Sequence, residues 1–512
     1  MSEERVAREA TTIEAAASAG IVASVVRNVS AMIAGQVVSF ALAFALRVAL
    51  GRYLGDVGFG KLTFALSIGA IFSTVGGLGL SPLVAKEAAR ALHLGGRYLA
   101  NGMALRLLVG LPLYGGFCLI VTLLKSDSET RTLAYLVGLA FLVDLLVSMT
   151  GALFQAHEKM VYISLGLIVE KLLTTGLSIW ALSIGYGVVA VGWVMVAAAA
   201  VNLVASLWFL TRLGPLRFSV DPGMLRSLLV AGAPFFVWAV FATIYFRIDA
   251  TMLSLMTNDA VTGWYGVSYT LYETLGFLPA MLKTVLLPIL SRLFASDRTG
   301  FRVTFSQAFY AYSLITPPIA FGTFALARPI VGLIYPLDQF ANAVGVLQIL
   351  SLGFIPLFYN ILLATVVVAA DKQRFWSLTA VACAVLNPAL NLFLIPHFQS
   401  TMGNGGVGAA WATNLIEMFL LFAGLALVPR GLLGQREWSV AARTMLAGSI
   451  MAGIVWSQRT ASLPEGVALG AASYVGCCLL LGVGRIRDVR DALDVIRGAR
   501  TRQERPEMLA GG

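Results

Sequence analysis

Long apolar runs dominate this sequence and constrain its fold more than any other feature. A helix needs about 20 mostly apolar residues to cross the hydrocarbon core of a bilayer. Fourteen runs meet this requirement, and none shows the alternation of a strand, so helices are favoured over a barrel. We predict an all-α integral membrane protein with about 14 transmembrane helices, at residues 29–50, 62–85, 98–124, 132–154, 160–183, 187–211, 228–256, 261–291, 304–326, 341–369, 375–396, 406–429, 440–457 and 465–484.

The composition agrees with a chain whose solvent is the bilayer. Of the 512 residues, 58% are hydrophobic and only 12% are charged, which is more apolar surface than a soluble domain of this length buries. The four Cys lie inside apolar runs and the three His are scattered, so neither a disulfide framework nor a metal site is predicted. We expect no cofactor and no enzymatic activity.

The Lys and Arg residues indicate the orientation of the chain in the membrane. If the N-terminus is cytosolic, the inner segments carry 25 of these residues and the outer segments carry 6. This asymmetry predicts a multi-pass protein of the cell inner membrane with both termini cytosolic. It also accounts for the net charge of +10, so nucleic acid is not expected as a partner. Residues 1–28 carry acids and no long apolar core, which indicates a cytosolic tail or surface helix.

One motif has the spacing of a nucleotide-binding loop but lacks the other features that such a loop needs. In GRYLGDVGFGK (51–61), Gly55, Gly60 and Lys61 have the G-x-x-x-x-G-K spacing of a P-loop. A P-loop needs Ser or Thr after the Lys to hold Mg²⁺, whereas Leu62 follows here, and it needs a preceding strand. The segment is also predicted to lie outside the cell. We therefore interpret the glycines as a tight turn between two spans and expect no nucleotide partner.

Short stretches recur in order along the chain, which indicates an internal duplication. The pairs lie at offsets between 205 and 216: GFGKLTFAL (58–66) with GWYGVSYTL (263–271), AHEKMVYISL (156–165) with AADKQRFWSL (369–378), and VGWV (191–194) with VGAA (407–410). The period holds six predicted helices, so the halves share one orientation, as in transporters with parallel repeats. The predicted organisation is a tail (1–28), a six-helix lobe (29–211), a cytosolic linker (212–227), a second six-helix lobe (228–429), two further helices (430–484) and a basic cytosolic tail (485–512).

Four stretches together carry a resemblance to a known family: RNVSAMIAGQVVSFALAFALRVALGRYLGDVGFGKLTFALSIG (27–69), GLGLSPLVAKEAAR (77–90), AHEKMVYISLG (156–166) and NGGVGAAWAT (404–413). In this order they resemble the polysaccharide-transporter family, the Wzx-type flippases of lipid-linked oligosaccharides. That family belongs to the multidrug/oligosaccharidyl-lipid/polysaccharide exporter superfamily. The resemblance covers residues 27 to about 430.

The resemblance implies a fold and a cargo. It implies two MATE-like lobes around a central cavity, working by alternating access. The cargo would be a polyprenyl-diphosphate-linked oligosaccharide, moved from the inner to the outer leaflet for cell-surface polysaccharide biosynthesis. Membrane lipids and polysaccharide polymerase machinery are the implied partners. One departure is HFQSTMGNGG (397–406), which we expect to be a longer loop than the family's usual turn.

Basic residues inside predicted spans are candidates for contact with the cargo, because a charge there costs at least about 2.5–3.5 kcal/mol at the bilayer centre. Arg47 and Arg247 occupy corresponding outer parts of the first helix in each half. Two guanidinium groups facing one cavity would grip a diphosphate with forked hydrogen bonds. Lys171 is a third candidate. The alternatives are that Arg47 snorkels, that Arg247 pairs with Asp249, and that Arg106 and Lys283 snorkel to the headgroups.

Five acidic residues inside predicted spans are candidates for ion coupling: Asp144, Glu170, Asp249, Glu273 and Glu417. A buried carboxylate can change protonation as its access to water changes. Glu170 and Lys171 are adjacent and project about 100° apart, so one of them is a candidate partner for Asp144. The alternative is that these carboxylates are structural.

Two other functions fit parts of the sequence. A multidrug/ion antiporter of the same superfamily would share the fold, and five bases against five acids in the spans do not decide between the two. A membrane glycosyltransferase or polymerase would need a metal site. Asp127 and Glu129 form an acid-x-acid pair on the outer side, but a solvated loop pair is the simpler interpretation, and the loop is short.

Overall fold

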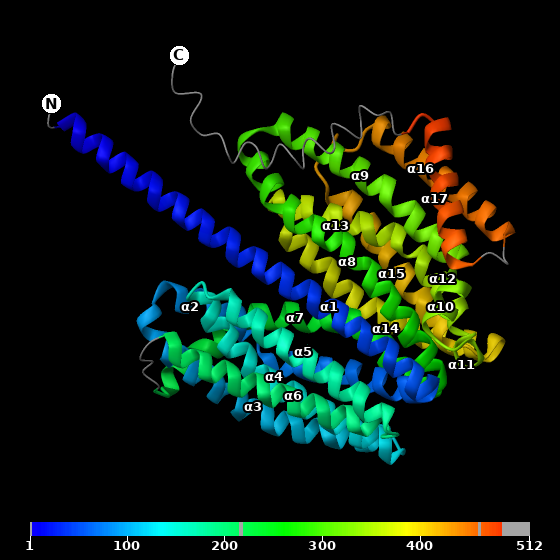
Figure 1. The fold of residues 1–512 in the computed structure, drawn as a ribbon, viewed down its shortest axis with the longest axis horizontal. Coiled ribbons are helices and arrows are strands. Elements are labelled where there is room, and N and C mark those ends of the chain that lie inside the picture. Colours follow the sequence, from blue (N-terminus) through cyan, green and yellow to red (C-terminus); the bar gives the residue numbers. More distant parts are fainter. Residues whose placement is uncertain (1–2, 214–218, 459–461, 484–512) are drawn as a thin grey trace. The chain divides into compact units, whose positions relative to one another are not determined.

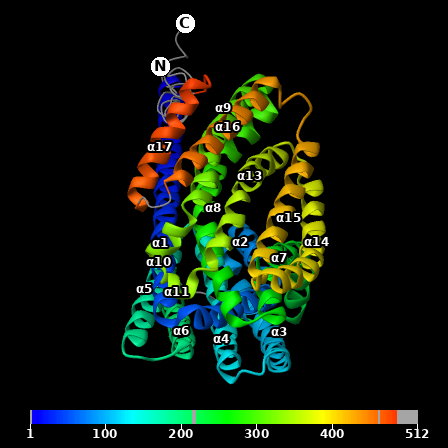
Figure 2. The same cartoon turned by 90° about the vertical axis from the view of Figure 1, so that its right-hand side faces the viewer.

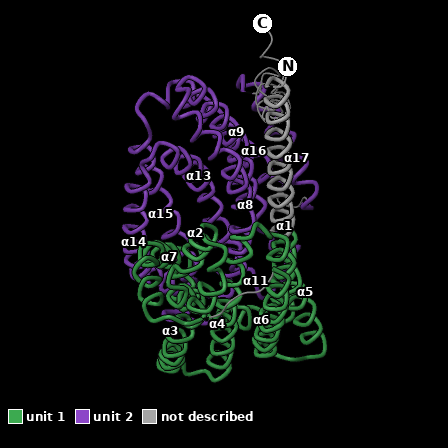
Figure 3. Tube along the Cα trace, turned by 90° about the vertical axis from the view of Figure 1, so that its left-hand side faces the viewer, with its two compact units in different colours: residues 1–251 green, residues 252–512 purple. Residues whose placement is uncertain are grey.

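The chain folds almost entirely into helices. The computed structural model describes residues 3–213, 219–458 and 462–483, with side chains from residue 38 onward, and these residues contain no strand (Figure 1). They form two compact units, residues 1–251 and 252–512 (Figure 3). The all-α prediction is confirmed, whereas the lobe boundaries at 29–211 and 228–429 stay a prediction. The predicted basic tail, residues 485–512, and residues 214–218 of the predicted linker lie outside the described residues.

The first unit contains seven α-helices and two 3₁₀ turns among its described residues. Their bounds are α1 Glu3–Gly77, α2 Leu80–Arg90, η1 Leu92–Leu94, α3 Gly95–Leu124, α4 Ser128–Ala156, α5 Met160–Ser183, α6 Val188–Leu210, η2 Thr211–Leu213 and α7 Pro222–Met256, whose last residues belong to the second unit. α4 packs against α6 and α2, and α5 packs against α1 and α6.

The second unit begins with the end of α7 and continues with ten helices among its described residues. Their bounds are α8 Asp259–Ser296, α9 Arg298–Ala325, α10 Ala327–Ile334, α11 Leu337–Phe340, α12 Ala343–Leu352, α13 Phe354–Ala369, α14 Gln373–Met402, α15 Gly405–Leu427, α16 Gln435–Ser457 and α17 Leu463–Leu480. α14 and α15 lie side by side, and so do α9 and α16 (Figure 2).

The helices are long and apolar enough for a multi-pass membrane protein. The described residues contain 12 candidate spans, or 13 if α9 and α10, which meet at a bend of 72°, count as one span. Each predicted range overlaps one of these candidates, but 29–50 and 62–85 fall on a single candidate, Val38–Arg90. The predicted count of 14 is therefore not confirmed. At 1.5 Å per residue those 53 residues extend about 80 Å, which is longer than one crossing.

Glycines break the first unit's helices at two places. Gly55 interrupts α1 with φ 66° and ψ −171°, a conformation open mainly to glycine. Gly58, Gly60 and Lys61 continue the helix beyond it, so the predicted tight turn is a single-residue break. Gly79 caps α2 with φ 64°, and a Cβ there would lie 2.5 Å from the backbone nitrogen of Phe236 on α7. The absence of a side chain thus lets α2 approach α7.

The repeat seen in the sequence has a matching local structure. Glu158, between α4 and α5, and Asp371, between α13 and α14, both adopt a positive φ, 57° and 59°. In each turn the next residue, Lys159 or Lys372, donates its backbone N–H five residues back, at 2.8 Å to Phe154 O and 3.0 Å to Val367 O. All these positions differ by the offset of 213 predicted for this pair of stretches. The two turns are therefore equivalent in conformation as well as in sequence.

One loop prediction was wrong. Residues 397–406 were expected to form a long loop, yet α14 continues to Met402 and only Gly403 and Asn404 separate it from α15. The hydroxyls of Ser400 and Thr401 donate to His397 O at 2.9 and 2.8 Å, so the polar side chains are used within the helix. A polar stretch that follows an apolar span can therefore continue the helix, and it does not by itself predict a loop.

Candidate functional site

A buried glutamate and two partly buried charges lie where α4, α5 and α6 pack together in the first unit. Glu170 on α5 is 8% exposed, and its Oε2 accepts a 2.8 Å hydrogen bond from Asn202 Nδ2 on α6. Its Oε1 lies 2.8 Å from Lys171 Nζ. Asp144 on α4 lies within electrostatic range of both, and its buried Oδ1 has no hydrogen-bond partner among the described residues. Lys171 therefore pairs with Glu170 and lies within electrostatic range of Asp144.

This group differs from the sequence prediction in two ways. Glu170 and Lys171 were expected to point apart, but the long Lys171 side chain turns back and pairs with its neighbour. Asn202 was not predicted, because a single Asn in the apolar run VNLV carries no charge that marks it. The structure thus places a buried carboxylate between an amide and an ammonium group.

The second unit holds a similar arrangement. Glu417 on α15 is 3% exposed, and Asn360 Nδ2 on α13 donates to its Oε2 at 2.6 Å and to its backbone oxygen at 2.8 Å. Tyr272 on α8 and Cys383 on α14 lie within electrostatic range of this carboxylate. The buried Tyr272 hydroxyl has no hydrogen-bond partner in the described part of the chain. Each unit thus holds a buried glutamate bound by an asparagine from a neighbouring helix.

The remaining predicted site residues are at varied depths. Asp249 on α7 is buried, at 3% exposed. Arg47 on α1, Arg247 on α7 and Glu273 on α8 are half-buried. The assignment of Arg47, Arg247 and Lys171 to a substrate cavity, and of the five acids to ion coupling, stays a prediction.

Arg106 on α3 is a buried cation that the sequence prediction misplaced. It was expected to snorkel, but it is 2% exposed. It donates to Ser148 Oγ at 2.5 Å, to Ser81 Oγ at 2.8 Å and to the backbone oxygens of Leu145 and Gly77. No carboxylate in the described residues lies within ion-pair distance of it. Neutral oxygens from α1, α2 and α4 hold the charge inside the unit, whereas Lys283 on α8 is exposed.

The false P-loop lysine and the acid-x-acid pair are partners of one another. Lys61 Nζ lies 2.9 Å from Asp127 Oδ2 and 2.6 Å from Glu129 Oε2. Asp127 also caps α4, and hydrogen bonds from Thr130 and Lys61 hold the pKa of Asp127 well below its usual range. The described residues contain no group of three or more potential metal ligands. Asp127 therefore caps α4, and both acids form ion pairs with Lys61.

The helical fold, with buried carboxylates in both units, has counterparts among solved membrane transporters. A structure of the lipid II flippase MurJ in an inward closed conformation matches with a TM-score of 0.68 at 15% identity, covering 88% of this chain and 97% of that one. An inward-facing MATE multidrug resistance transporter of the MOP superfamily matches at 0.61 and 13% identity, covering 79% and 95%. The fold is thus that of the MOP-superfamily flippases and transporters.

The sequence comparisons place the chain more narrowly. Residues 25–294 match the family described as polysaccharide biosynthesis protein, which is more than half of the chain, and the chain belongs to this family. A probable lipid II flippase MurJ of Vibrio cholerae is 26% identical over 295 residues, which span 54% of this chain and 55% of that protein. The resemblance stated from sequence is confirmed. The relatives are flippases and transporters, in agreement with the prediction that the chain is not an enzyme.

Proposed function

We propose that this protein flips a polyprenyl-diphosphate-linked oligosaccharide from the inner to the outer leaflet by alternating access, for cell-surface polysaccharide biosynthesis. The family match over residues 25–294 carries the proposal. The likeness to a lipid II flippase in sequence and fold supports a cargo that is a lipid carrying sugar through a phosphate link.

The cargo's diphosphate is the part that a membrane rejects most strongly. Arg47 and Arg247 are our candidates to shield it, because a planar guanidinium matches phosphate oxygens with two parallel hydrogen bonds. Lys171 is a third candidate, and its ammonium is paired with Glu170 in this structure. Moving about two negative charges outward runs down an inside-negative potential and releases about 4–5 kcal/mol at 100 mV. That gradient can drive export without a fuel site.

The buried acids are our candidates for ion coupling. Glu170 and Glu417 each accept a hydrogen bond from an asparagine. The other three acids, Asp144, Asp249 and Glu273, lie on α4, α7 and α8, which are candidate spans. Protonation of such a carboxylate removes the cost of a buried charge and changes which helix packing is favoured. Coupling to an ion would let transport continue when the membrane potential is low.

The proposal includes a place in the cell. The 25 to 6 distribution of Lys and Arg supports an inner-membrane protein with both termini cytosolic. A role beside polysaccharide polymerase machinery is part of the proposal because of the family to which the chain belongs. Reporter fusions at residue 512 and near Asp127 test the orientation. Reporters on opposite sides agree with it, and reporters on the same side contradict it.

The function is tested by export of polysaccharide from living cells. In a strain that depends on this protein, Arg247→Ala should reduce surface polysaccharide by about ten- to hundredfold, because a charged hydrogen bond is worth about 1.5–3 kcal/mol. Arg247→Lys should retain part of the output, and Lys283→Ala, at an exposed cation of α8, should retain all of it. Output is measured per unit of inserted protein. Wild-type export by Arg247→Ala would remove Arg247 from the proposal.

A further inference from the structure

A cavity of about 450 Å³ opens in the second unit between α9, α16 and the segment joining α15 to α16. α9 and α16 run side by side (Figure 1). The lining residues come from the first half of α9, the start of α16 and the segment before α16. Arg302 and Arg436 line it from the two helices, and both side chains are exposed. With Glu437, the cavity combines two arginines and one carboxylate at one end of α9 and α16.

The lining changes character along α9. Arg302 lies one turn inside the helix, and Phe309 lies seven residues further, which is about 10 Å along the axis. Val440 on α16 adds a second apolar side chain beyond the arginines. A headgroup layer is about 5–8 Å thick on each side of the hydrocarbon core. An offset of about 10 Å between the charged and apolar parts exceeds this thickness by a few Å, so the arginines lie at the headgroup level when Phe309 lies at the start of the acyl chains.

Two polar groups in the cavity have no partner among the residues that the structure describes. Arg302 makes no hydrogen bond or ion pair with the described residues, and its Nη2 would lie 3.6 Å from a Cβ placed on Gly431. The buried Oε1 of Gln307 has no hydrogen-bond partner among them either. Glu437 also lines the cavity: its two oxygens accept from Ser306 Oγ at 2.7 Å and Gly434 N–H at 2.9 Å, and Arg436 lies within electrostatic range of it. Two arginines against one carboxylate leave the lining with a net positive charge.

We propose that this cavity binds the phosphate of an anionic phospholipid, with Arg302 and Arg436 on the phosphate and Gln307 on a headgroup hydroxyl. Basic pockets between transmembrane helices are a recognised way of holding anionic headgroups. In the predicted topology the cavity opens to the inner leaflet. This site goes beyond the transported cargo and does not depend on what that cargo is.

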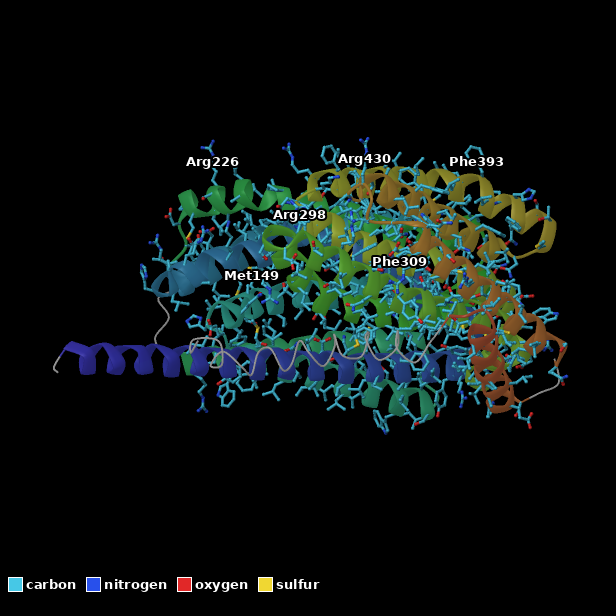
Figure 4. The ribbon with its side chains drawn as sticks, turned by 90° about the horizontal axis from the view of Figure 1, so that it is seen from above. Met149, Arg226, Arg298, Phe309, Phe393 and Arg430 are labelled. Carbon is cyan, nitrogen blue, oxygen red and sulfur yellow. The ribbon has the colours of Figure 1, made fainter. Side chains whose placement is uncertain are left out.

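Native mass spectrometry of the purified full-length chain tests the proposal, with phosphatidylglycerol, phosphatidylcholine and a polyprenyl diphosphate as separate probes. Phosphatidylglycerol should bind more tightly than phosphatidylcholine, and Arg302→Gln with Arg436→Gln should weaken it at least about tenfold. Arg226→Gln is the matched control. Figure 4 shows Arg226 projecting from the first unit, where it is exposed on the same predicted side of the membrane.

A second variant keeps the test independent of the arginines' effect on folding. Val303 lines the cavity and is 51% exposed, so Val303→Phe should fill it without disturbing the core and should also weaken phosphatidylglycerol binding. Unchanged binding in both variants, or equal binding of the two phospholipids, would overturn the proposal. If polyprenyl diphosphate binds these arginines more tightly than phosphatidylglycerol does, the cavity belongs to the cargo and the phospholipid assignment is wrong.

Discussion

Lys61 on α1 lies 2.6 Å from Glu129 on α4, although 68 residues separate them in the sequence. With Asp127 at 2.9 Å, this contact joins the second part of α1 to the start of α4. Lys61→Met should lower stability by on the order of 1 kcal/mol, because the lysine side chain is only 13% exposed but both acids are partly solvated. Thermal unfolding in detergent measures the loss.

The same experiment tests the nucleotide interpretation. Added ATP should leave the melting temperature of both wild type and Lys61→Met unchanged, since the lysine is engaged by two carboxylates. An increase with ATP in wild type that disappears in the variant would restore the P-loop reading.

Asp127 gives the Lys61 contact a pH dependence. Hydrogen bonds from Thr130 and Lys61 hold its folded-state pKa below the unfolded value of about 3.9. A carboxyl group with a lowered pKa contributes stability that is present above the unfolded pKa and lost as pH falls through the folded one. Wild type should therefore exceed Asp127→Asn in melting temperature at pH 7, and the difference should shrink below about pH 4. A difference that stays constant down to pH 3 would contradict this assignment.

The effects on stability of substituting Glu170 and Lys171 should not be additive, because the two side chains form an ion pair. Lys171→Met leaves Glu170 without its ammonium partner and Asp144 without a nearby positive charge, and removing one partner of a buried pair costs about 3–5 kcal/mol. Because Lys171 is 35% exposed, we expect the lower end of this range or less. The double variant Lys171→Met, Glu170→Gln should recover most of the loss, because Gln keeps an oxygen for Asn202. A double variant less stable than Lys171→Met alone would show that the charge of Glu170 is needed for folding.

Removing the Asn360 amide should lower the stability of the protein more than removing a buried amide that bonds to a neutral oxygen. Asn360→Ala leaves a 3% exposed carboxylate without its amide donor and should destabilise the protein by about 1–3 kcal/mol. Asn414→Ala is the matched control, since Asn414 is equally buried but donates to a neutral oxygen, Ile349 O, at 2.6 Å. Unfolding in detergent at neutral pH compares the two. Equal losses of stability in the two variants would mean that Asn360 stabilises the Glu417 carboxylate no more than an amide stabilises a neutral oxygen.

A structural feature of this protein can be predicted from the sequence when the residues that form it are close together along the chain. The spans follow from local apolar runs, and the turn at Glu158 follows from its repeat at Asp371, because both features are contained in a few neighbouring residues. The acids that pair with Lys61 and the asparagine that donates to Glu170 come from distant parts of the chain, so no local pattern marks them.

Arg106 shows why depth was misjudged for some charges. Its position about two turns from the predicted end of a span made snorkelling the expected outcome. The structure instead surrounds it with the hydroxyls of Ser81 and Ser148, two residues that look unremarkable in sequence. Charge burial in a bundle depends on which neutral oxygens the neighbouring helices supply, and that information is not local.

The central claim is the cargo, and a reconstituted flipping assay tests it most directly. The full-length chain is placed in vesicles with a fluorescent polyprenyl-diphosphate-linked oligosaccharide, and a membrane-impermeant quencher reports the label on the outer face. The account predicts that wild type exchanges the label between leaflets faster than protein-free vesicles, and that Arg247→Ala does so about ten- to hundredfold more slowly. Exchange no faster than in protein-free vesicles, together with proton-driven export of a cationic drug, would contradict the account and identify a multidrug antiporter.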